Sequence, residues 1–283
     1  MLILGLTGSI ATGKSSVSRL LSQEPHNLPV IDADVLARRV VAPGTRAYKK
    51  IVEQFSPIIP DLLLPSPLES THENGKGPKT VDKSSVASPL NRVALGRCVF
   101  GDSEKCRHNR MLLNNIVHPA VRREMVKEVL KAYLCGHWLL VLDVPLLFEG
   151  HLDLFCSTVL VVAVRDIQLQ LKRLMHRDPH LSQKDAEARI QSQADLTEKV
   201  KKCLNRGSGQ RGLVIYNDGD LNDLDKEVKR VITQLKNSHP KWWTWLLWFF
   251  PLFAFSMALW HLGMNWLANR KWKKKRSVSQ SNV

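Results

Sequence analysis

The stretch Gly8-Ser9-Ile10-Ala11-Thr12-Gly13-Lys14-Ser15 decides the fold of this chain. It follows an apolar run at residues 2–6 and precedes residues 15–21, which have the pattern of a helix start. The spacing G-x-x-x-x-G-K-[ST] between a strand and a helix is that of a phosphate-binding loop. The glycines let the backbone curl so that its N–H groups and the helix N-terminus face phosphates. A glycine-rich turn with a solvated lysine is the alternative.

The loop residues have different expected roles in nucleotide binding. Lys14 reaches the β- and γ-phosphates and is assigned a catalytic role, whereas the Ser15 hydroxyl holds Mg²⁺. Nucleotide binding is assigned to the whole loop and the next residue, namely Gly8, Ser9, Ile10, Ala11, Thr12, Gly13, Lys14, Ser15 and Ser16.

Further apolar runs indicate the sheet into which this loop is built. They lie at residues 30–31, 138–142, 158–164 and 213–215, with helical stretches such as 119–134 and 185–194 between them. Strands that alternate with helices predict an α/β fold with a mostly parallel, doubly wound sheet in three layers. Ligands bind such sheets at the carboxyl ends of the strands, where Gly8, Asp32 and Asp143 are expected.

Composition excludes disordered and fibrous classes. The chain has 283 residues, of which 44% are hydrophobic and 24% charged, enough for a real core without metal or disulfide staples. Its five cysteines show no C-x-x-C pair and are interpreted as reduced thiols. The net charge of +15 favours phosphates and a membrane surface over nucleic acid as partners.

Two carboxylates follow the second predicted strand. Asp32 and Asp34 lie beside the expected γ-phosphate position, where a carboxylate accepts a hydroxyl proton and helps to orient Mg²⁺. A small-molecule kinase requires such a group. The alternative is a polar strand end or a helix cap.

A basic set surrounds the predicted helix after the fourth strand. Arg173 and Arg177 are four residues apart and therefore share one helical face, from which they can neutralise a transferring phosphoryl group. A solvated basic face is an equal alternative. The other members of the set are Arg165, Lys172 and Arg189.

Several ordered motifs together resemble the dephospho-coenzyme A kinase family over residues 2–235. The matches begin with Gly5-Leu6-Thr7-Gly8 through Ser15, and continue with Val30-Ile31-Asp32-Ala33-Asp34, Ala37-Arg38, Val40-Val41 and Pro43-Gly44. They go on through Leu113-Asn114, His118-Pro119, Asp143-Val144-Pro145-Leu146-Leu147-Phe148-Glu149, Gln170-Leu171-Lys172-Arg173-Leu174-Met175, Arg177-Asp178, Arg189-Ile190, Gln193 and Asn217-Asp218-Gly219.

This resemblance implies phosphorylation of the ribose 3′-hydroxyl of dephospho-coenzyme A by ATP with Mg²⁺. It implies a kinase domain over residues 1–236, with a mobile lid at 165–195 and a substrate-binding helical region at 34–134. Asp32 is then the base and a metal ligand, Arg173 is catalytic, and Arg177 and Asn217 bind the nucleotide. Substrate binding falls to Asp34, Arg38, Arg92, Asn114 and His118.

Two of these residues keep alternative interpretations. His118 precedes Pro119 and is equally explained as a histidine at a helix entry. Asp143 follows an apolar strand and resembles a Walker B carboxylate, and a purely structural role explains it equally well.

Two insertions depart from the family pattern. Residues 57–89 are rich in proline, serine and glycine, and we expect a disordered loop within the substrate region. Residues 205–212 lengthen the loop near the nucleotide base, which leaves the adenine contacts open.

The C-terminal tail has a different composition from the rest of the chain. Residues 242–269 carry no formal charge, and seven of the eight tryptophans fall between Trp242 and Trp272. Twenty apolar residues, as a rough measure, cross a bilayer, so we predict a transmembrane anchor at 242–269 and a basic tail at 270–283. Because Pro251 interrupts the segment, an interfacial or re-entrant segment is the alternative.

The predicted anchor sets the expected location. A hydrophobic C-terminal segment on a chain without a signal sequence predicts a tail-anchored protein that faces the cytosol, on the mitochondrial outer membrane or the endoplasmic reticulum. Two other functions compete with the coenzyme A kinase. They are a kinase for another nucleotide-like acceptor and a weakly active nucleotide-binding adaptor on a membrane.

Overall fold

The computed structural model describes residues 1–64, 88–192, 196–207, 211–238 and 251–281. The chain divides into two compact units, which we call the sheet unit and the helical unit. The sheet unit comprises Met1–Asp32 and Val129–Val283, and the helical unit comprises Ala33–Glu128. The bounds of the helical unit lie near the predicted substrate-binding region at 34–134, whose role stays a prediction.

A five-stranded parallel sheet forms the centre of the sheet unit, with strand order β2-β3-β1-β4-β5. The predicted α/β class with a parallel sheet is confirmed. The strands are β1 (Leu2–Gly8), β2 (Val30–Asp32), β3 (Leu139–Asp143), β4 (Thr158–Ala163) and β5 (Gly212–Tyr216). β3 and β4 are buried along their whole length, as expected for parallel strands covered by helices on both faces.

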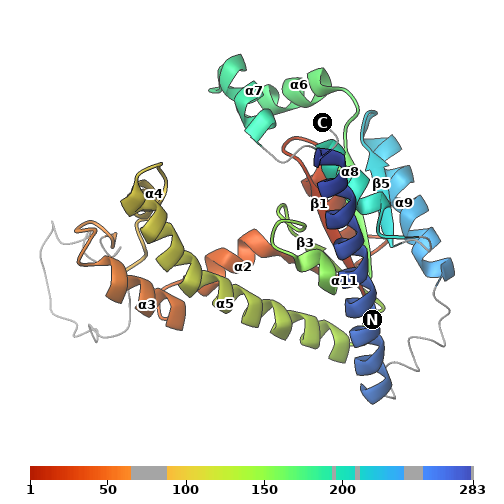
Figure 1. Ribbon diagram of the computed structural model, residues 1–283, viewed down its shortest axis with the longest axis horizontal. Helices are drawn as coiled ribbons and strands as arrows, with labels where there is room; N and C mark the ends of the chain where they lie inside the picture. The colour runs from red at the N-terminus through yellow and green to blue at the C-terminus, as the bar shows by residue number, and fades with distance from the viewer. Residues whose placement is uncertain (65–87, 193–195, 208–210, 239–250, 282–283) are drawn as a thin grey trace, which may run out of the picture. The chain divides into compact units, whose positions relative to one another are not determined.

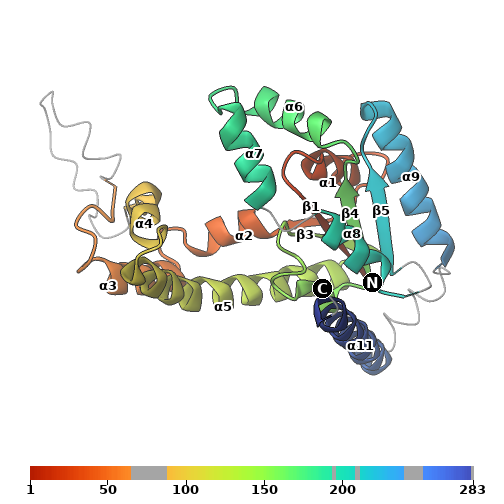
Figure 2. The same ribbon diagram turned by 45° about the horizontal axis from the view of Figure 1, so that its top comes forward.

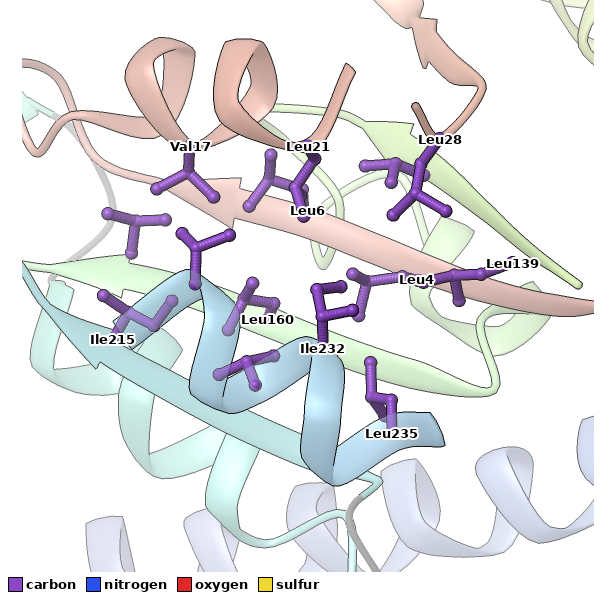
Figure 3. Close-up of a cluster of buried hydrophobic side chains, with 14 of the residues drawn as sticks. Leu4, Leu6, Val17, Leu21, Leu28, Leu139, Leu160, Ile215, Ile232 and Leu235 are labelled. Carbon is purple, nitrogen blue, oxygen red and sulfur yellow. The ribbon is translucent and has the colours of Figure 1, made fainter. Parts of the chain in front are cut away.

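Helices α1 (Lys14–Ser22) and α9 (Leu221–Ser238) cover one face of the sheet. Figure 3 shows Val17 and Leu21 of α1 and Ile232 and Leu235 of α9 packed against leucines of the strands. This cluster is almost completely withdrawn from water, and burial of each such side chain stabilises the fold by about 1.5–3 kcal/mol. The cluster therefore fixes α1, and with it the loop that precedes α1, on the sheet.

The opposite face of the sheet is covered by α8 (Leu196–Leu204), as Figure 2 shows. Packing there is close, because a Cβ on Gly5 of β1 would come within 2.7 Å of the Cys156 sulfur. Among the described residues, the sheet unit also contains α6 (Ile167–Arg177), α7 (Gln183–Ser192), the 3₁₀ helix η1 (Leu152–Phe155) and α11 (Pro251–Ser281), of which the three α-helices are labelled in Figure 1.

The helical unit has its own core. Its elements are α2 (Ala33–Val40), α3 (Arg46–Phe55), α4 (Arg92–Val99) and most of α5 (Glu104–Leu134). Thr45 and Asn91 cap α3 and α4 by accepting from the N–H groups of Tyr48 and Ala94. Tyr48, Ile51 and Phe55 of α3 pack with α4.

Helix α5 begins earlier than the sequence indicates. We expected a helix from residue 119, with a proline at its first position, whereas Pro119 lies inside a helix of 31 residues. A proline inside a helix costs about 3 kcal/mol or more. The residues before it, Leu112, Leu113, Ile116 and Val117, pack against the core of the helical unit and offset that cost.

Part of the predicted insertion at 57–89 is packed. Ile59 and Leu62 are buried in the core of the helical unit, and Leu63 forms an antiparallel bridge with Leu90. Residues 57–64, Ser88 and Pro89 therefore have defined structure, and the expectation of disorder does not hold for them. The rest of the prediction, for residues 65–87, lies outside the described residues.

The predicted membrane anchor is not supported. Among the residues that the structure describes, no helix is long and apolar enough to cross a membrane. The apolar stretch of α11 is interrupted by His261 and Asn265, and the helix continues through the cationic residues from Arg270 onward. Asn265 is buried and donates to the carbonyl oxygens of Leu154 and Cys156. The first part of the predicted span, residues 242–250, lies outside the described residues.

The predicted tail-anchored location is contradicted as well. A tail-anchored protein on the mitochondrial outer membrane or the endoplasmic reticulum needs a spanning helix, and the described helices provide none. The sequence pattern misled because a run of uncharged residues looks the same whether it faces lipid or, like Asn265, packs on a protein surface.

Candidate active site

The phosphate loop connects the carboxyl end of β1 to the N-terminus of α1. Its backbone has positive φ at two residues, 58° at Ala11, where it is unfavourable, and 93° at Gly13, where glycine accommodates it. Gly13 also has no room for a side chain, because a Cβ there would overlap the Asn217 amide nitrogen. Within the loop, the Thr12 hydroxyl donates to the Ser9 carbonyl at 2.9 Å. These features form the curled backbone that the sequence predicts.

Lys14 and two carboxylates converge at the carboxyl edge of the sheet. The Lys14 ammonium group lies 2.6 Å from Oδ1 of Asp143, the last residue of β3. Asp32, the last residue of β2, is aligned with Asp143 across the two strands. The sheet register therefore places a cation and two carboxylates within one small region.

The pKa of Asp143 is governed mainly by its burial. Only 3% of its side chain is exposed, and this burial raises the pKa of the carboxyl group above its ordinary value. The hydrogen bond from Lys14, its positive charge and a hydrogen bond from Ser18 act in the opposite direction, whereas the Asp32 charge adds to the rise. The effect of burial on the pKa of Asp143 is therefore larger than the opposite effect of the ion pair with Lys14.

Ser15 and Ser16 lie in the first turn of α1, directly after Lys14. Ser15 is exposed and Ser16 is half-buried. The Ser16 N–H donates to the Gly13 carbonyl at 3.0 Å, which closes the loop onto the helix. Ser15 is thus positioned at the rim of the loop, where a hydroxyl is available to a metal ion.

Helix α6 also contacts the phosphate loop. Gln170 donates from Nε2 to the Ile10 carbonyl at 2.6 Å, and Leu171 and Leu174 pack with Ile10 and Ala11. Arg173 on the same helix donates to the carbonyl oxygens of Asn217 and Gly219, at 2.7 and 3.1 Å.

Asn217 follows β5 and reaches the phosphate loop. Its side-chain Nδ2 donates to the Thr12 carbonyl at 2.9 Å, and the residue is only 8% exposed. The structure thus brings Asn217 and Arg173 to the phosphate loop, together with Lys14 and Asp32.

The other arginines of the predicted lid make contacts with acidic residues. Arg177 donates two hydrogen bonds to Asp178, and Arg189 of α7 lies 3.9 Å from the same carboxylate. The hydrogen bond from Arg177 is the main reason that the pKa of Asp178 lies below its ordinary value. Arg165 pairs with Asp218 and lies over the Tyr216 ring.

The five predicted substrate-binding residues belong to the helical unit and are all exposed. Helical spacing places Asp34 and Arg38 on one face of α2, and Asn114 and His118 on one face of α5. Arg92 is the first residue of α4. His118 lies inside α5, so its interpretation as a helix-entry residue is wrong.

Sequence reasoning missed two buried polar residues near the site. One is Gln170, to which no role was assigned. The other is Lys199 of α8, which lies 3.2 Å from Glu149 and donates to the Pro145 carbonyl at 3.1 Å. The Thr7 hydroxyl of β1 donates to the same carbonyl at 2.9 Å. Both partners lie in the loop after Asp143, so Lys199 supports that loop, and only the fold reveals this contact.

Comparison with known proteins gives a consistent result. The dephospho-CoA kinase family model matches residues 2–64 and 78–223. The chain is 40% identical over 276 residues to dephospho-CoA kinase CAB5 of Saccharomyces cerevisiae, which covers 96% of this chain and 98% of the yeast protein. It is 40% identical over 230 residues to the dephospho-CoA kinase of Bacillus cereus, which covers 81% of this chain and 95% of that protein.

Two solved structures are similar to this chain. The dephospho-CoA kinase from Campylobacter jejuni matches with a TM-score of 0.56 and 25% identity, over 83% of this chain and 97% of its own. The TT1252 protein from Thermus thermophilus matches with a TM-score of 0.58 and 28% identity, over 83% of this chain and 98% of its own. With its phosphate loop, parallel sheet and these relatives, the chain belongs to the dephospho-CoA kinase family.

Proposed function

We propose that the cluster of Lys14, Asp32 and Asp143 is the centre at which this dephospho-CoA kinase transfers the γ-phosphoryl group of ATP. The observation that supports this most directly is the 2.6 Å contact between Lys14 and Asp143 beside the end of β2. Asp143 holds the lysine side chain at the phosphate loop. A fixed cation there stabilises negative charge on the β- and γ-phosphates as it develops in the transition state.

Asp32 acts as the base in this proposal. Its carboxylate accepts the proton of the ribose 3′-hydroxyl while the 3′-oxygen bonds to the γ-phosphorus and the bond to the β,γ-bridging oxygen breaks. The products are ADP and coenzyme A. Asp32 is the last residue of β2 and belongs to the sheet unit.

The donor set at this edge fits Mg²⁺. This ion prefers hard oxygen ligands and usually binds through one or two carboxylates together with substrate phosphates. The Ser15 hydroxyl and the Asp32 carboxylate are such ligands, and both lie at the carboxyl edge of the sheet. When bound, the ion neutralises phosphate charge.

Arg173 is proposed to assist from α6. Its guanidinium group uses one N–H on each terminal nitrogen for the carbonyl oxygens of Asn217 and Gly219. Other donors of the group remain available to a phosphate. Arg177 is proposed to bind the nucleotide, in exchange for its present contact with Asp178. The region 165–195 acts as the lid in this proposal.

The acceptor is proposed to bind to the helical unit. The exposed residues Asp34, Arg38, Arg92, Asn114 and His118 offer cations for the diphosphate of dephospho-CoA and hydrogen-bonding groups for its ribose. Such a set suits a large, anionic substrate.

A product analysis tests the proposed chemistry. The full-length chain is incubated with ATP, Mg²⁺ and one acceptor at a time, and ³¹P NMR locates the new phosphate. We expect a 3′-phosphate on dephospho-CoA, and at most traces of product from AMP, adenosine or pantetheine. Equal transfer to AMP would contradict the proposed acceptor site. Lack of any transfer by a folded chain would contradict the proposed centre.

A further inference from the structure

Two buried amide side chains donate hydrogen bonds to carbonyl oxygens of the phosphate loop. Gln170 of α6 donates to the carbonyl oxygen of Ile10 at 2.6 Å, and Asn217 after β5 donates to that of Thr12 at 2.9 Å. Gln170 is 3% exposed and Asn217 is 8% exposed. A buried donor of this kind that loses its acceptor is costly, so both bonds are strongly preferred.

The direction of these bonds has a geometric consequence. In a trans peptide the C=O and the N–H point in opposite directions. A carbonyl of Ile10 that points at Gln170 therefore turns the N–H of Ala11 toward the other side of the loop. In the same way, a carbonyl of Thr12 that points at Asn217 turns the N–H of Gly13 to the other side.

The same two peptides precede two residues of unusual backbone conformation. Ala11 and Gly13 are the loop positions with positive φ, and an alanine in that region is unfavourable unless its surroundings hold it there. Within the described part of the chain, the N–H groups of Ala11 and Gly13 donate to no protein acceptor. A loop with strained backbone and free donors needs external restraint to keep one conformation.

We propose that Gln170 and Asn217 are positioning residues, which hold the Ile10 and Thr12 carbonyls outward so that the Ala11 and Gly13 N–H groups point at the nucleotide phosphates. This inference rests on the proposed function, in which the loop holds those phosphates. It assigns Gln170 a role, and it makes Asn217 a support of the loop in place of a direct nucleotide contact.

Arg173 links the two supports. It lies one turn after Gln170 on α6, and it donates to the backbone carbonyl of Asn217. One helix therefore holds the loop directly through Gln170 and indirectly through Asn217. The orientation of the loop donors depends in this way on α6, a helix far from the loop in sequence.

The first test removes each donor without removing its bulk. Gln170→Met and Asn217→Leu keep approximate side-chain size but cannot donate a hydrogen bond. We expect kcat/KM for ATP to fall by about tenfold or more, because misdirected donors lose part of the roughly 10²–10³-fold effect of one such group. KM for dephospho-CoA stays within about twofold, because the acceptor side is untouched.

Matched controls separate this role from a general loss of stability. Gln168→Met lies on the same helix as Gln170 but is exposed, and Asn222→Leu is an exposed counterpart for Asn217. Both controls should retain wild-type constants. Circular dichroism reports the folded fraction, to which all rates are normalised. A normalised kcat/KM for ATP equal to that of the controls would overturn the proposal, as would an effect confined to KM for dephospho-CoA.

A second variant gives a signature that packing alone cannot produce. Gln170→Glu keeps the size of the side chain, and its carboxyl group donates to the Ile10 carbonyl only when it is protonated. Burial raises the pKa of a carboxyl group, so we expect the activity relative to Gln168→Glu to rise as the pH falls from about 8 to about 5. A constant ratio would overturn the proposal. This variant also provides the test if Gln170→Met does not fold.

Lys14→Ala distinguishes failure of the inference from failure of the proposed function. If Lys14→Ala is inactive while the Gln170 and Asn217 variants behave as their controls, only the positioning role is wrong. If Lys14→Ala retains activity, the loop is not the catalytic phosphate site, and both conclusions are wrong.

Discussion

Lys14 at the start of α1 and Asp143 at the end of β3 form an ion pair of 2.6 Å, although they are 129 residues apart in the chain. The pair connects the phosphate loop to the neighbouring strand. Because burial raises the pKa of Asp143 despite the lysine, the carboxylate is held in the site at a cost. A buried carboxyl group with a shifted pKa and a specific charged partner is a candidate for a functional role.

Replacement of the lysine tests this centre. Lys14→Ala removes the cation that stabilises growing charge on the transferred group, an effect of several kcal/mol. We expect steady-state assays to show kcat below about one hundredth of the wild-type value. Lys201→Ala, at an exposed position of α8, is the control. Retention of more than about a tenth of wild-type kcat would exclude this loop as the catalytic phosphate site.

Asp32→Asn tests the proposed base. The substitution keeps the size of the side chain but removes the proton acceptor, so kcat should fall by roughly 10²-fold or more. ATP affinity, measured by calorimetry without acceptor, should change little. If kcat at saturating substrates stays near normal, Asp32 is not the base, and Asp34→Asn is then the variant to measure.

The sequence predicted the parts of the molecule that depend on local pattern. Leu2–Gly8 and Lys14–Ser22 follow from an apolar run and a glycine-rich loop, and the placement of Asp32 and Asp143 follows from the rule that ligands meet strand ends. These features need only neighbours in the chain and the topology of a parallel sheet.

Contacts between distant segments could not be predicted. Gln170 meets Ile10 across 160 positions, and Lys199 meets Pro145 across 54. A buried amide or lysine has no periodicity that distinguishes it from an exposed one. The prediction of a membrane span in the tail lacked the same information, because the burial of Asn265 against Leu154 depends on a contact across 111 positions.

Lys199 should support the loop that follows Asp143. Lys199→Met removes one of the two donors to the Pro145 carbonyl, the other being the Thr7 hydroxyl, and it removes the cation beside the Glu149 carboxylate. The net contribution of one such hydrogen bond is about 0.5–1.5 kcal/mol. We expect urea unfolding to show a loss of that size. The exposed Lys201→Met should lie within about 0.5 kcal/mol of wild type. Equal stability of the two variants would show that Lys199 does not support the loop.

Two buried thiols should affect stability at alkaline pH. Burial raises the pKa of Cys156 and of Cys203 to about 12. Between the ordinary thiol pKa and about 12, the unfolded chain releases protons that the folded chain keeps, so the free energy of unfolding falls as pH rises. Each thiol contributes up to about 1.4 kcal/mol per pH unit.

Urea unfolding at several alkaline pH values checks this effect. Cys156→Ala should show a shallower decline of unfolding free energy with pH than the wild type, because it lacks one of the two thiols. Identical slopes would mean that the Cys156 pKa is not raised. In the native protein at pH 8, iodoacetamide should modify the exposed Cys135 and leave Cys156 and Cys203 unmodified.

The C-terminal helix α11 is attached to the sheet unit by polar contacts around a buried ion pair. Asp153 of η1 and Arg206 lie 2.8 Å apart, with 0% and 2% of their side chains exposed. Asn269 donates to the same Asp153 carboxylate at 3.0 Å. Asn265 donates to two backbone carbonyls and accepts from Arg211, whose pKa is lowered by burial and by the charge of Arg206.

Asn265→Ala should therefore loosen α11. The substitution leaves the Leu154 and Cys156 carbonyls and the Arg211 guanidinium group without this partner, which costs about 1–3 kcal/mol. We expect urea unfolding to show that loss, and hydrogen exchange to show faster exchange of the α11 amides. Asn237→Ala, at the exposed end of α9, is the control and should change neither quantity. If Asn265→Ala matches that control in both measurements, α11 is not held on the sheet unit through Asn265.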